Sequence, residues 1–347
     1  MAGAASADST FIGPLNTVTP LASTIPQNGD VNPYGVAVIP RSTGDLFRGN
    51  VLVSNFNNKA NVQGTGTTVV EVTPGGQVSQ FAKIGNMAGA CPGGVGLTTA
   101  LTALRSGWVI VGSLPTRKGA VSGPGCLIVL DRFGHVRETF TGNGINGPWD
   151  MGSVDLGSQA VLFVTNVLNG TVAAKGKVVF GGTVLRLVIK IPRFGLPFIW
   201  FRATIGSGFP ERLDPAALVI GPTGVNLGAH HVLYVADTLR NRIAAIPNAL
   251  FRTFSAGTGF TVTRGHHVVG PLGLVIAPNG NILIVNSGNG NLVEITPFGA
   301  QIAVRRLDSG GGPPPGAGDL FGLAVKPGHR AVYYVDDGTN TLNLLHR

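Results

Sequence analysis

Oxygen-bearing side chains end several short apolar stretches of the sequence, where they are placed to bind a divalent cation. Asn166 and Asp237 each end such a stretch and are the predicted metal ligands. Hard cations such as calcium take six to eight oxygen ligands from carboxylates, carbonyls and amides. The expected metal is one calcium, zinc or copper ion. Asn and Asp side chains also fold back on their own backbone at tight turns, so a purely structural role stays open.

Further side chains near the starts and ends of these stretches are expected to contact a bound ligand. The predicted ligand-binding residues are Asp30, Asn55, Trp149, His266, Asn286 and Asp336. An imidazole beside one or two carboxylates suits zinc binding or general-base catalysis. His267 and Asp150 are therefore the predicted proton-transfer residues. The alternative for the His266–His267 pair is two solvated linker histidines.

The composition indicates which elements must position these residues. Of 347 residues 53 are glycine, and only 12% are charged, whereas 44% are hydrophobic. A coiled coil, a helix bundle and a disordered chain are excluded, because all three need a different balance of charged, glycine and apolar residues. Many short strands joined by glycine-rich turns are expected instead.

An internal repeat organises these strands. One unit, a Pro- or Gly-led turn followed by apolar strands, starts near residues 32, 91, 147, 214, 270 and 321. Strands buried on both faces and repeated radially define a β-propeller. We predict an all-β, six-bladed β-propeller of four-stranded antiparallel blades. Residues 11–347 form one domain, residues 11–25 supply the strand that closes the last blade, and residues 1–10 are a flexible N-terminus.

The segment Val232–Ile243 resembles the NHL repeat, and 286–292 and 336–342 are looser copies of it. The resemblance implies a six-bladed propeller, distantly similar to the gluconolactonase and strictosidine-synthase-like group. Propellers of this kind include binding modules and lyases, and gluconolactonase-like members hold a divalent metal through a Glu near the first inner strand. This sequence has no Glu in the matching region Asn32–Val36, although Asp30 lies just before it.

In a propeller, the linkers into the innermost strands and the turns after the second strands meet at one mouth of the central channel. Nine of the sixteen acidic residues are expected there: Asp30, Asp150, Glu211, Asp214, Asp237, Asp308, Asp319, Asp336 and Asp337. We therefore predict that a small molecule or protein partner binds at this acid-rich mouth. The first alternative is a metal-dependent, lactonase-like hydrolase or lyase that uses the same mouth. The second is a structural or assembly component.

Charge and hydropathy limit the other kinds of partner that the protein could have. The net charge is +9, yet no run of four or more basic residues occurs, so nucleic-acid binding is not expected. No apolar run is long enough to span a membrane. The segment Arg186–Phe209 interleaves cations with aromatic residues. It predicts either an exposed patch for a glycan, a lipid surface or another protein, self-association included, or the buried outer strands of a large blade.

The chain termini and cysteines bear on localisation. Residues 1–10 carry no basic and apolar signal sequence, which we interpret as a mature terminus whose signal peptide has been replaced by a start Met. An extracellular or periplasmic protein is expected. Cys91 and Cys126 are the only cysteines, and either one disulfide or two buried thiols fits their pattern.

Overall fold

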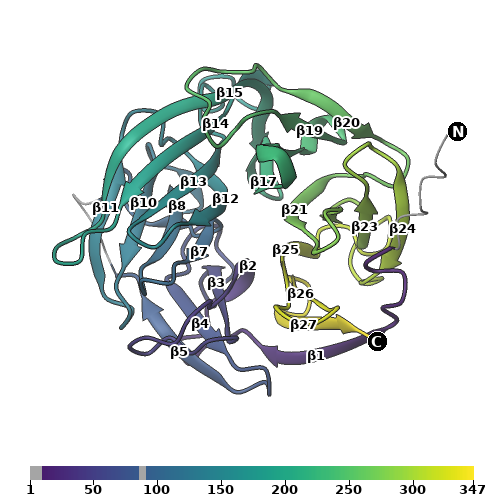
Figure 1. Ribbon diagram of the computed structural model, residues 1–347, viewed down its shortest axis with the longest axis horizontal. Helices are drawn as coiled ribbons and strands as arrows, with labels where there is room; N and C mark the ends of the chain where they lie inside the picture. The colour runs from purple at the N-terminus through teal and green to yellow at the C-terminus, as the bar shows by residue number, and fades with distance from the viewer. Residues whose placement is uncertain (1–9, 86–90) are drawn as a thin grey trace, which may run out of the picture.

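Six antiparallel sheets stand around a ring in the computed structural model, which describes residues 10–85 and 91–347 (Figure 1). The predicted all-β, six-bladed propeller is confirmed. The first blade consists of β2 (Val31–Val38), β3 (Val51–Asn57), β4 (Thr68–Val72) and β5 (Val78–Lys83). The second consists of β6 (Gly96–Leu97), β7 (Leu101–Ala103), β8 (Val109–Arg117), β9 (Ala120–Val121), β10 (Cys126–Leu130) and β11 (Val136–Thr141).

The third blade is the largest, because its outer two strands are long. It contains β12 (Pro148–Asp155), β13 (Gln159–Asn166), β14 (Val179–Lys190), β15 (Phe198–Asp214) and β16 (Leu218–Ile220). The fourth contains β17 (Pro222–Leu227), β18 (Leu233–Asp237), β19 (Arg242–Ile246) and β20 (Phe260–Arg264), with 3-10 turns η1 (Ala229–His231) and η2 (Thr238–Arg240). The fifth contains β21 (Pro271–Ile276), β22 (Ile282–Asn286), β23 (Asn291–Ile295) and β24 (Gln301–Arg306).

The last blade joins the two ends of the chain. It contains β25 (Leu320–Val325), β26 (Val332–Asp336), β27 (Thr341–His346) and, as its outermost strand, β1 (Thr17–Ser23). Strand β1 pairs antiparallel with β27, from Thr17 opposite His346 to Ser23 opposite Thr341. Figure 1 shows the purple strand β1 beside the yellow strand β27. The predicted closing strand within residues 11–25 is therefore confirmed, whereas the flexible N-terminus lies largely outside the described residues.

Two blades do not begin where the sequence repeat predicted. Residues 214–220 were expected to open the fourth blade, but β16 pairs with β15 and belongs to the third. The fourth blade opens at Pro222 instead. The run Leu218–Ile220 is as apolar as an inner strand, because it packs on other apolar side chains at the channel mouth. In the second blade, the inner position is divided between the short strands β6 and β7.

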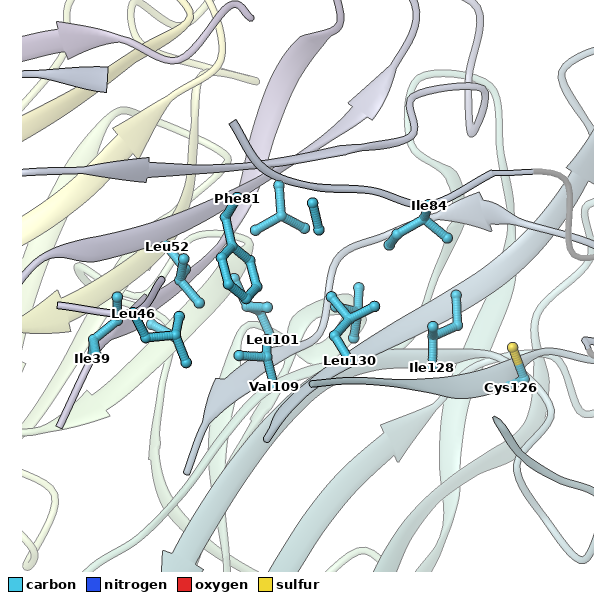
Figure 2. Packing of buried hydrophobic residues seen from close by; sticks show 14 of the residues in the cluster. Ile39, Leu46, Leu52, Phe81, Ile84, Leu101, Val109, Cys126, Ile128 and Leu130 are labelled. Carbon is cyan, nitrogen blue, oxygen red and sulfur yellow. The ribbon is translucent and has the colours of Figure 1, made fainter. Parts of the chain in front are cut away.

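Apolar layers between neighbouring blades hold the ring together. Every residue of β3 is buried, because its two faces pack against two different sheets. Figure 2 shows one such layer, in which Leu52 and Phe81 of the first blade meet Leu101, Val109 and Leu130 of the second. The six inner strands β2, β7, β12, β17, β21 and β25 stand side by side around the channel. None of the described residues forms a helix of the length and hydropathy that a membrane span needs.

A buried carboxylate fastens the N-terminal segment to the fifth blade. Glu294, in the middle of β23, is fully buried and accepts the backbone N–H groups of Phe11 at 2.7 Å and Ile12 at 2.8 Å. The side-chain amide of Asn281 donates to the same carboxylate at 2.7 Å. Both Phe11 and Ile12 are themselves buried beside this blade. The segment that leads into β1 is thus fastened to the fifth blade.

A disulfide joins the two cysteines, which settles the alternative that the sequence left open. Cys91 and Cys126 are both fully buried, and their Cα atoms lie 5.5 Å apart. The bond ties the segment that enters the second blade to the start of β10. It closes a loop of 35 residues.

We predict that Glu294→Gln weakens the ring closure. The amide keeps one acceptor oxygen but turns an N–H₂ group toward a backbone N–H, so one buried donor loses its partner. The free energy of unfolding should fall by about 2–3 kcal/mol, measured by urea denaturation. Glu138→Gln on β11 is the matched control and should change stability by less than about 0.5 kcal/mol. Equal effects of the two substitutions would contradict the fastening role.

The double substitution Cys91→Ala/Cys126→Ala should cost about 3–4 kcal/mol, from the entropy that the cross-link removes from the unfolded chain. The comparison is urea unfolding with and without a reductant. Reductant should destabilise the wild-type protein and leave the double variant unchanged. A wild-type protein insensitive to reductant under unfolding conditions would argue against the bond.

Candidate functional site

An aromatic chamber of about 290 Å³ lies at the end of the channel where the inner strands begin. Its wall comes from five blades and from the connections between them. The lining residues are Tyr34, Phe56, Gln63, Leu97, Thr99, Trp149, Asp214, Ala216, Ala217, Ile220, Leu272, Ser287, Gly318, Phe321 and Asp337. A concave, largely apolar site with a few polar groups is the usual form of a small-molecule site.

The aromatic wall is held in a defined arrangement. The indole N–H of Trp149 donates to the hydroxyl of Tyr34 at 2.8 Å. The Tyr34 ring packs 5.2 Å from that of Phe321, which in turn lies 6.0 Å from the ring of Phe56. Tyr34 and Trp149 are almost fully buried. Because the Trp149 bond occupies only an acceptor position, the Tyr34 O–H is available as a donor to a ligand.

The connection between β15 and β16 covers one side of the chamber. Asp214, Ala216 and Ala217 line the chamber from this connection. The side-chain amide of Gln63, in the first blade, donates to the carbonyl of Ala216 at 3.1 Å. The segment that resembled an inner strand is therefore a cover that reaches across the mouth from the third blade to the first.

Asp150 occupies a distinctive position on the inner strands. In five blades, the residue that pairs with the end of the second strand is followed two positions later by an equivalent inner-strand residue, which in four of them lines the channel. Four blades have glycine there: Gly35, Gly224, Gly273 and Gly322. At each, a Cβ would overlap a backbone oxygen of the next inner strand. Only the third of these five blades carries a side chain, so Asp150 places a single carboxyl group in the channel.

Burial in the channel raises the pKa of Asp150 to about 7, although the backbone N–H of Met151 donates to its carboxylate and lowers the pKa. This bond is 2.7 Å long. The Asp150 charge also acts on Tyr34, whose phenol pKa rises well above its usual value, chiefly through burial and secondarily through this carboxylate. The carboxyl group of Asp150 therefore exchanges its proton near neutral pH, and its charge acts on the phenol of Tyr34 in the aromatic wall.

A second carboxyl group with a raised pKa reaches the chamber. Burial raises the pKa of Asp337 to about 7, the amide of Asn32 lowers it, and repulsion from Asp319 and Asp336 raises it further. One oxygen of Asp337 is buried without a hydrogen-bond partner. Burial and the adjacent Asp308 also raise the pKa of Asp319, to about 6. Of the nine acidic residues predicted at the mouth, Asp214 and Asp337 line the chamber.

Three of the predicted asparagines make hydrogen bonds to the linkers that enter their blades. Asn55 donates its amide to the carbonyl of Thr24 at 2.7 Å. Asn166 accepts the backbone N–H of Asn146 at 3.2 Å, and Asn286 accepts that of Val269 at the same distance. Each contact fixes the segment that enters the same blade. The alternative of structural Asn side chains therefore accounts for the contacts observed at all three positions.

The three predicted aspartates at blade entrances and strand ends also have protein partners. Asp30 accepts the backbone N–H of Thr67 at 2.7 Å, and Asp336 accepts that of Thr339 at 2.9 Å. Asp237 is fully buried and pairs with Arg242 at 2.8 Å and Arg240 at 3.5 Å. Burial raises the pKa of the Asp237 carboxyl, and the two guanidinium groups lower it.

The histidine pair lies between β20 and β21. The rings of His266 and His267 meet edge to face, with centroids 3.9 Å apart, and the backbone N–H of His267 donates to Gln301. Of the ten predicted site residues, only Trp149 and Asp150 are among those that line the chamber or the channel in the described part of the chain.

The donor set of the chamber does not fit a divalent cation. A hard cation needs several oxygen ligands converging on one point, whereas most of this wall is ring and aliphatic carbon. Within residues 10–85 and 91–347, no three His, Cys, Asp or Glu side chains come together in a way that could hold a metal ion. Asn166 and Asp237 make the structural contacts given above. No catalytic step is therefore derived through a metal.

Of the aromatic wall, only Trp149 was predicted from the sequence, and Tyr34, Phe56 and Phe321 were missed. A signal was nevertheless present. Aligning the repeats places Tyr34, Trp149 and Phe321 at the same position, directly before the channel-facing residue. The same alignment would have shown Asp150 in the place of a repeated glycine.

We predict that Asp150→Asn stabilises the protein at alkaline pH. A carboxyl whose pKa is about 7 when folded and about 4 when unfolded favours the folded state below pH 4, and this contribution is lost as pH rises through 7. At pH 8 the variant should be more stable than wild type by about 2–4 kcal/mol, and at pH 4 the difference should vanish. Thermal unfolding across this range measures both values.

Asp131→Asn is the matched control, because the backbone N–H groups of His135 and Phe133 outweigh the effect of burial and lower the Asp131 pKa. This control should show the opposite sign, with a loss of stability at pH 8. A stability difference for Asp150→Asn that does not change with pH would contradict the assignment.

The sequence matches no model of a known protein family and no curated protein sequence. Solved structures share the fold. A gluconolactonase from Xanthomonas campestris is 12% identical with a TM-score of 0.57, covering 95% of this chain and 88% of that one. Virginiamycin B lyase from Staphylococcus aureus is 12% identical with a TM-score of 0.56, covering 95% and 99%. Regucalcin from Agrobacterium tumefaciens, described as a calcium-binding protein, is 13% identical with a TM-score of 0.53, covering 94% and 90%. The chain is thus a six-bladed β-propeller distantly similar in fold to the gluconolactonase-like group.

Proposed function

We propose that the protein binds a small, mainly apolar molecule in the aromatic chamber. The observation that carries this proposal is the chamber wall of aromatic rings, of which Tyr34 also lines the adjoining channel. In that channel Asp150 supplies the single carboxyl group, at a position where four other blades have glycine. The chamber volume of about 290 Å³ suits a compact ligand. The rings supply apolar contact, and Tyr34 supplies a hydrogen-bond donor for a carbonyl or hydroxyl oxygen of that ligand.

A protein partner at the mouth is less well supported than a small molecule. The cover formed by Asp214–Ala217 leaves a narrow, concave site, whereas protein interfaces need broad surfaces. A structural role alone would not explain an isolated carboxyl in the channel, since burial without an ionic partner costs stability. Small-molecule binding explains both features.

Hydrolysis of the bound molecule is a second candidate function, favoured by the pKa of about 7 at Asp150. A general base works best when its pKa is close to the working pH. In this scheme, the lactone or ester carbonyl of the ligand enters the channel beside Tyr34, where the carboxylate of Asp150 accepts a proton from water as the water oxygen attacks that carbonyl. The O–H of Tyr34 donates a hydrogen bond to the carbonyl oxygen. Opening of a lactone ring returns the proton to the alkoxide, and the product is a hydroxy acid.

Export is also part of the proposal, because a buried disulfide persists in oxidising compartments and is rare in the cytosol. We infer an extracellular or periplasmic location. Localisation of the tagged natural protein by cell fractionation tests this inference, and recovery with Cys91 and Cys126 as free thiols in the cytosol would contradict it.

Binding can be tested with γ-decalactone, which combines an ester carbonyl with an apolar tail. Wild-type protein should gain about one to two degrees in melting temperature at millimolar lactone, since a ligand that binds only the folded state stabilises it. Ala217→Trp fills the chamber and should remove the gain. Ala173→Trp places the same side chain on an exposed loop and should retain it.

Turnover of the lactone is followed in the same samples by acid release at constant pH. Turnover that disappears in Asp150→Asn, while the melting gain persists, would support hydrolysis in addition to binding. A melting gain without turnover supports binding alone. An equal gain in Ala217→Trp and wild type would contradict the chamber as the binding site.

A further inference from the structure

The face opposite the chamber carries exposed phenylalanines on its hairpins. In an antiparallel blade, the hairpins between the first and second strands and between the third and fourth lie at one end of the propeller. Three of the hairpins between third and fourth strands have a phenylalanine at the same turn position, directly before a glycine of positive φ. These residues are Phe133, Phe194 and Phe298. Their exposed fractions are 43%, 84% and 94%. Hairpin turns favour Gly, Asn and Asp, so phenylalanine here is costly without a partner.

Further apolar side chains extend this feature around the ring. Phe47 is exposed on the hairpin between β2 and β3, and Leu156 is exposed between β12 and β13. Phe251 and Phe254 are exposed on the long connection between β19 and β20. Five of the six blades therefore present at least one large apolar side chain toward the same side.

Basic residues accompany these tips. The hairpins of this face contain eight Lys or Arg residues but only two acidic residues, Asp45 and Asp131. Asp131 is buried and paired with Arg137 at 3.0 Å, so its charge is neutralised. The basic residues are Arg41, Arg48, Arg105, Arg132, Arg193, Arg252, Lys326 and Arg330. The chamber mouth with its acidic residues lies on the other side.

A groove of about 690 Å³ lies on the basic face, between the hairpins of the second and third blades. Arg132, Arg137 and Arg193 line it together with Phe133 and Leu196. The guanidinium groups of Arg132 and Arg193 lie over the rings of Phe133 and Phe194, at 5.1 and 5.5 Å from the ring centroids. Neither arginine has an ion-pair partner in the described part of the chain. Two unpaired arginines in one groove suit a phosphate group.

We propose that this hairpin face docks the protein peripherally on an anionic lipid bilayer. The phenylalanine tips enter the boundary between head groups and acyl chains, and the surrounding arginines attract the negative surface. The groove receives one lipid phosphate between Arg132 and Arg193. The chamber then faces away from the bilayer, toward solvent. A soluble polyanion would match the charge but would leave the exposed phenylalanines unexplained.

The test is co-sedimentation of the full chain with phosphatidylcholine vesicles that do or do not contain phosphatidylglycerol. Wild-type protein should bind only the anionic vesicles, and added salt should weaken the binding. Phe194→Ser/Phe298→Ser should lower the partition coefficient roughly tenfold or more. Arg132→Gln/Arg193→Gln should lower it by about fivefold for each charge removed.

Phe180→Ser is the control, because Phe180 is also exposed, at 65%, but lies at the chamber end, where the guanidinium of Arg240 in η2 packs over its ring. It should bind vesicles as wild type does, and all variants should keep the wild-type melting temperature. Unchanged vesicle binding by the phenylalanine double variant, or binding to heparin in place of vesicles, would overturn the proposal. A wild-type dimer that the same double variant converts to a monomer, without vesicle binding, would assign the face to self-association and also overturn it.

Discussion

Closure of the ring is the constraint on which the remaining geometry depends. Strand β1 pairs with β27 to complete the sixth blade, and Glu294 holds Phe11 and Ile12, in the segment that leads into β1, against the fifth blade. With the ring closed, the inner strands approach so closely that Gly35, Gly224, Gly273 and Gly322 admit no Cβ. The same closure brings Tyr34 of the first blade against Phe321 of the last. The chamber therefore exists only in the closed ring.

The closed ring also determines the chemistry of its acids. Asp150 lies within the channel and Asp337 at its mouth, and both lose hydration without gaining a cationic partner in the described residues. Their pKa values rise to about 7 for this reason. Asp237, by contrast, has Arg242 and Arg240 beside it and serves as a structural ion pair. Asp237 is also fully buried, whereas Asp150 and Asp337 are half-buried, so the neighbours of these carboxyl groups and not their depth distinguish them.

The sequence was sufficient to predict the propeller, because burial of strands on both faces leaves a periodic apolar pattern. It also identified the closing strand, since the last repeat lacks its outer partner. Residues 214–220 were misassigned because an apolar cover over a chamber and an apolar inner strand have the same composition. The metal and ligand roles of Asn55, Asn166 and Asn286 could not be distinguished from linker contacts, which use the same side-chain atoms. The disulfide could not be predicted, because the spacing of Cys91 and Cys126 in the sequence does not give the distance between their Cα atoms.

The most direct test of the account is the titration of the Asp150 carboxyl carbon by carbon-13 NMR, with the resonance assigned by its loss in Asp150→Asn. A midpoint near pH 7 is predicted, because the chamber and channel remove water from this group. A midpoint near pH 4 would show an ordinary hydrated carboxylate. That result would contradict both the proton-transfer role and the view of the channel mouth as an apolar site.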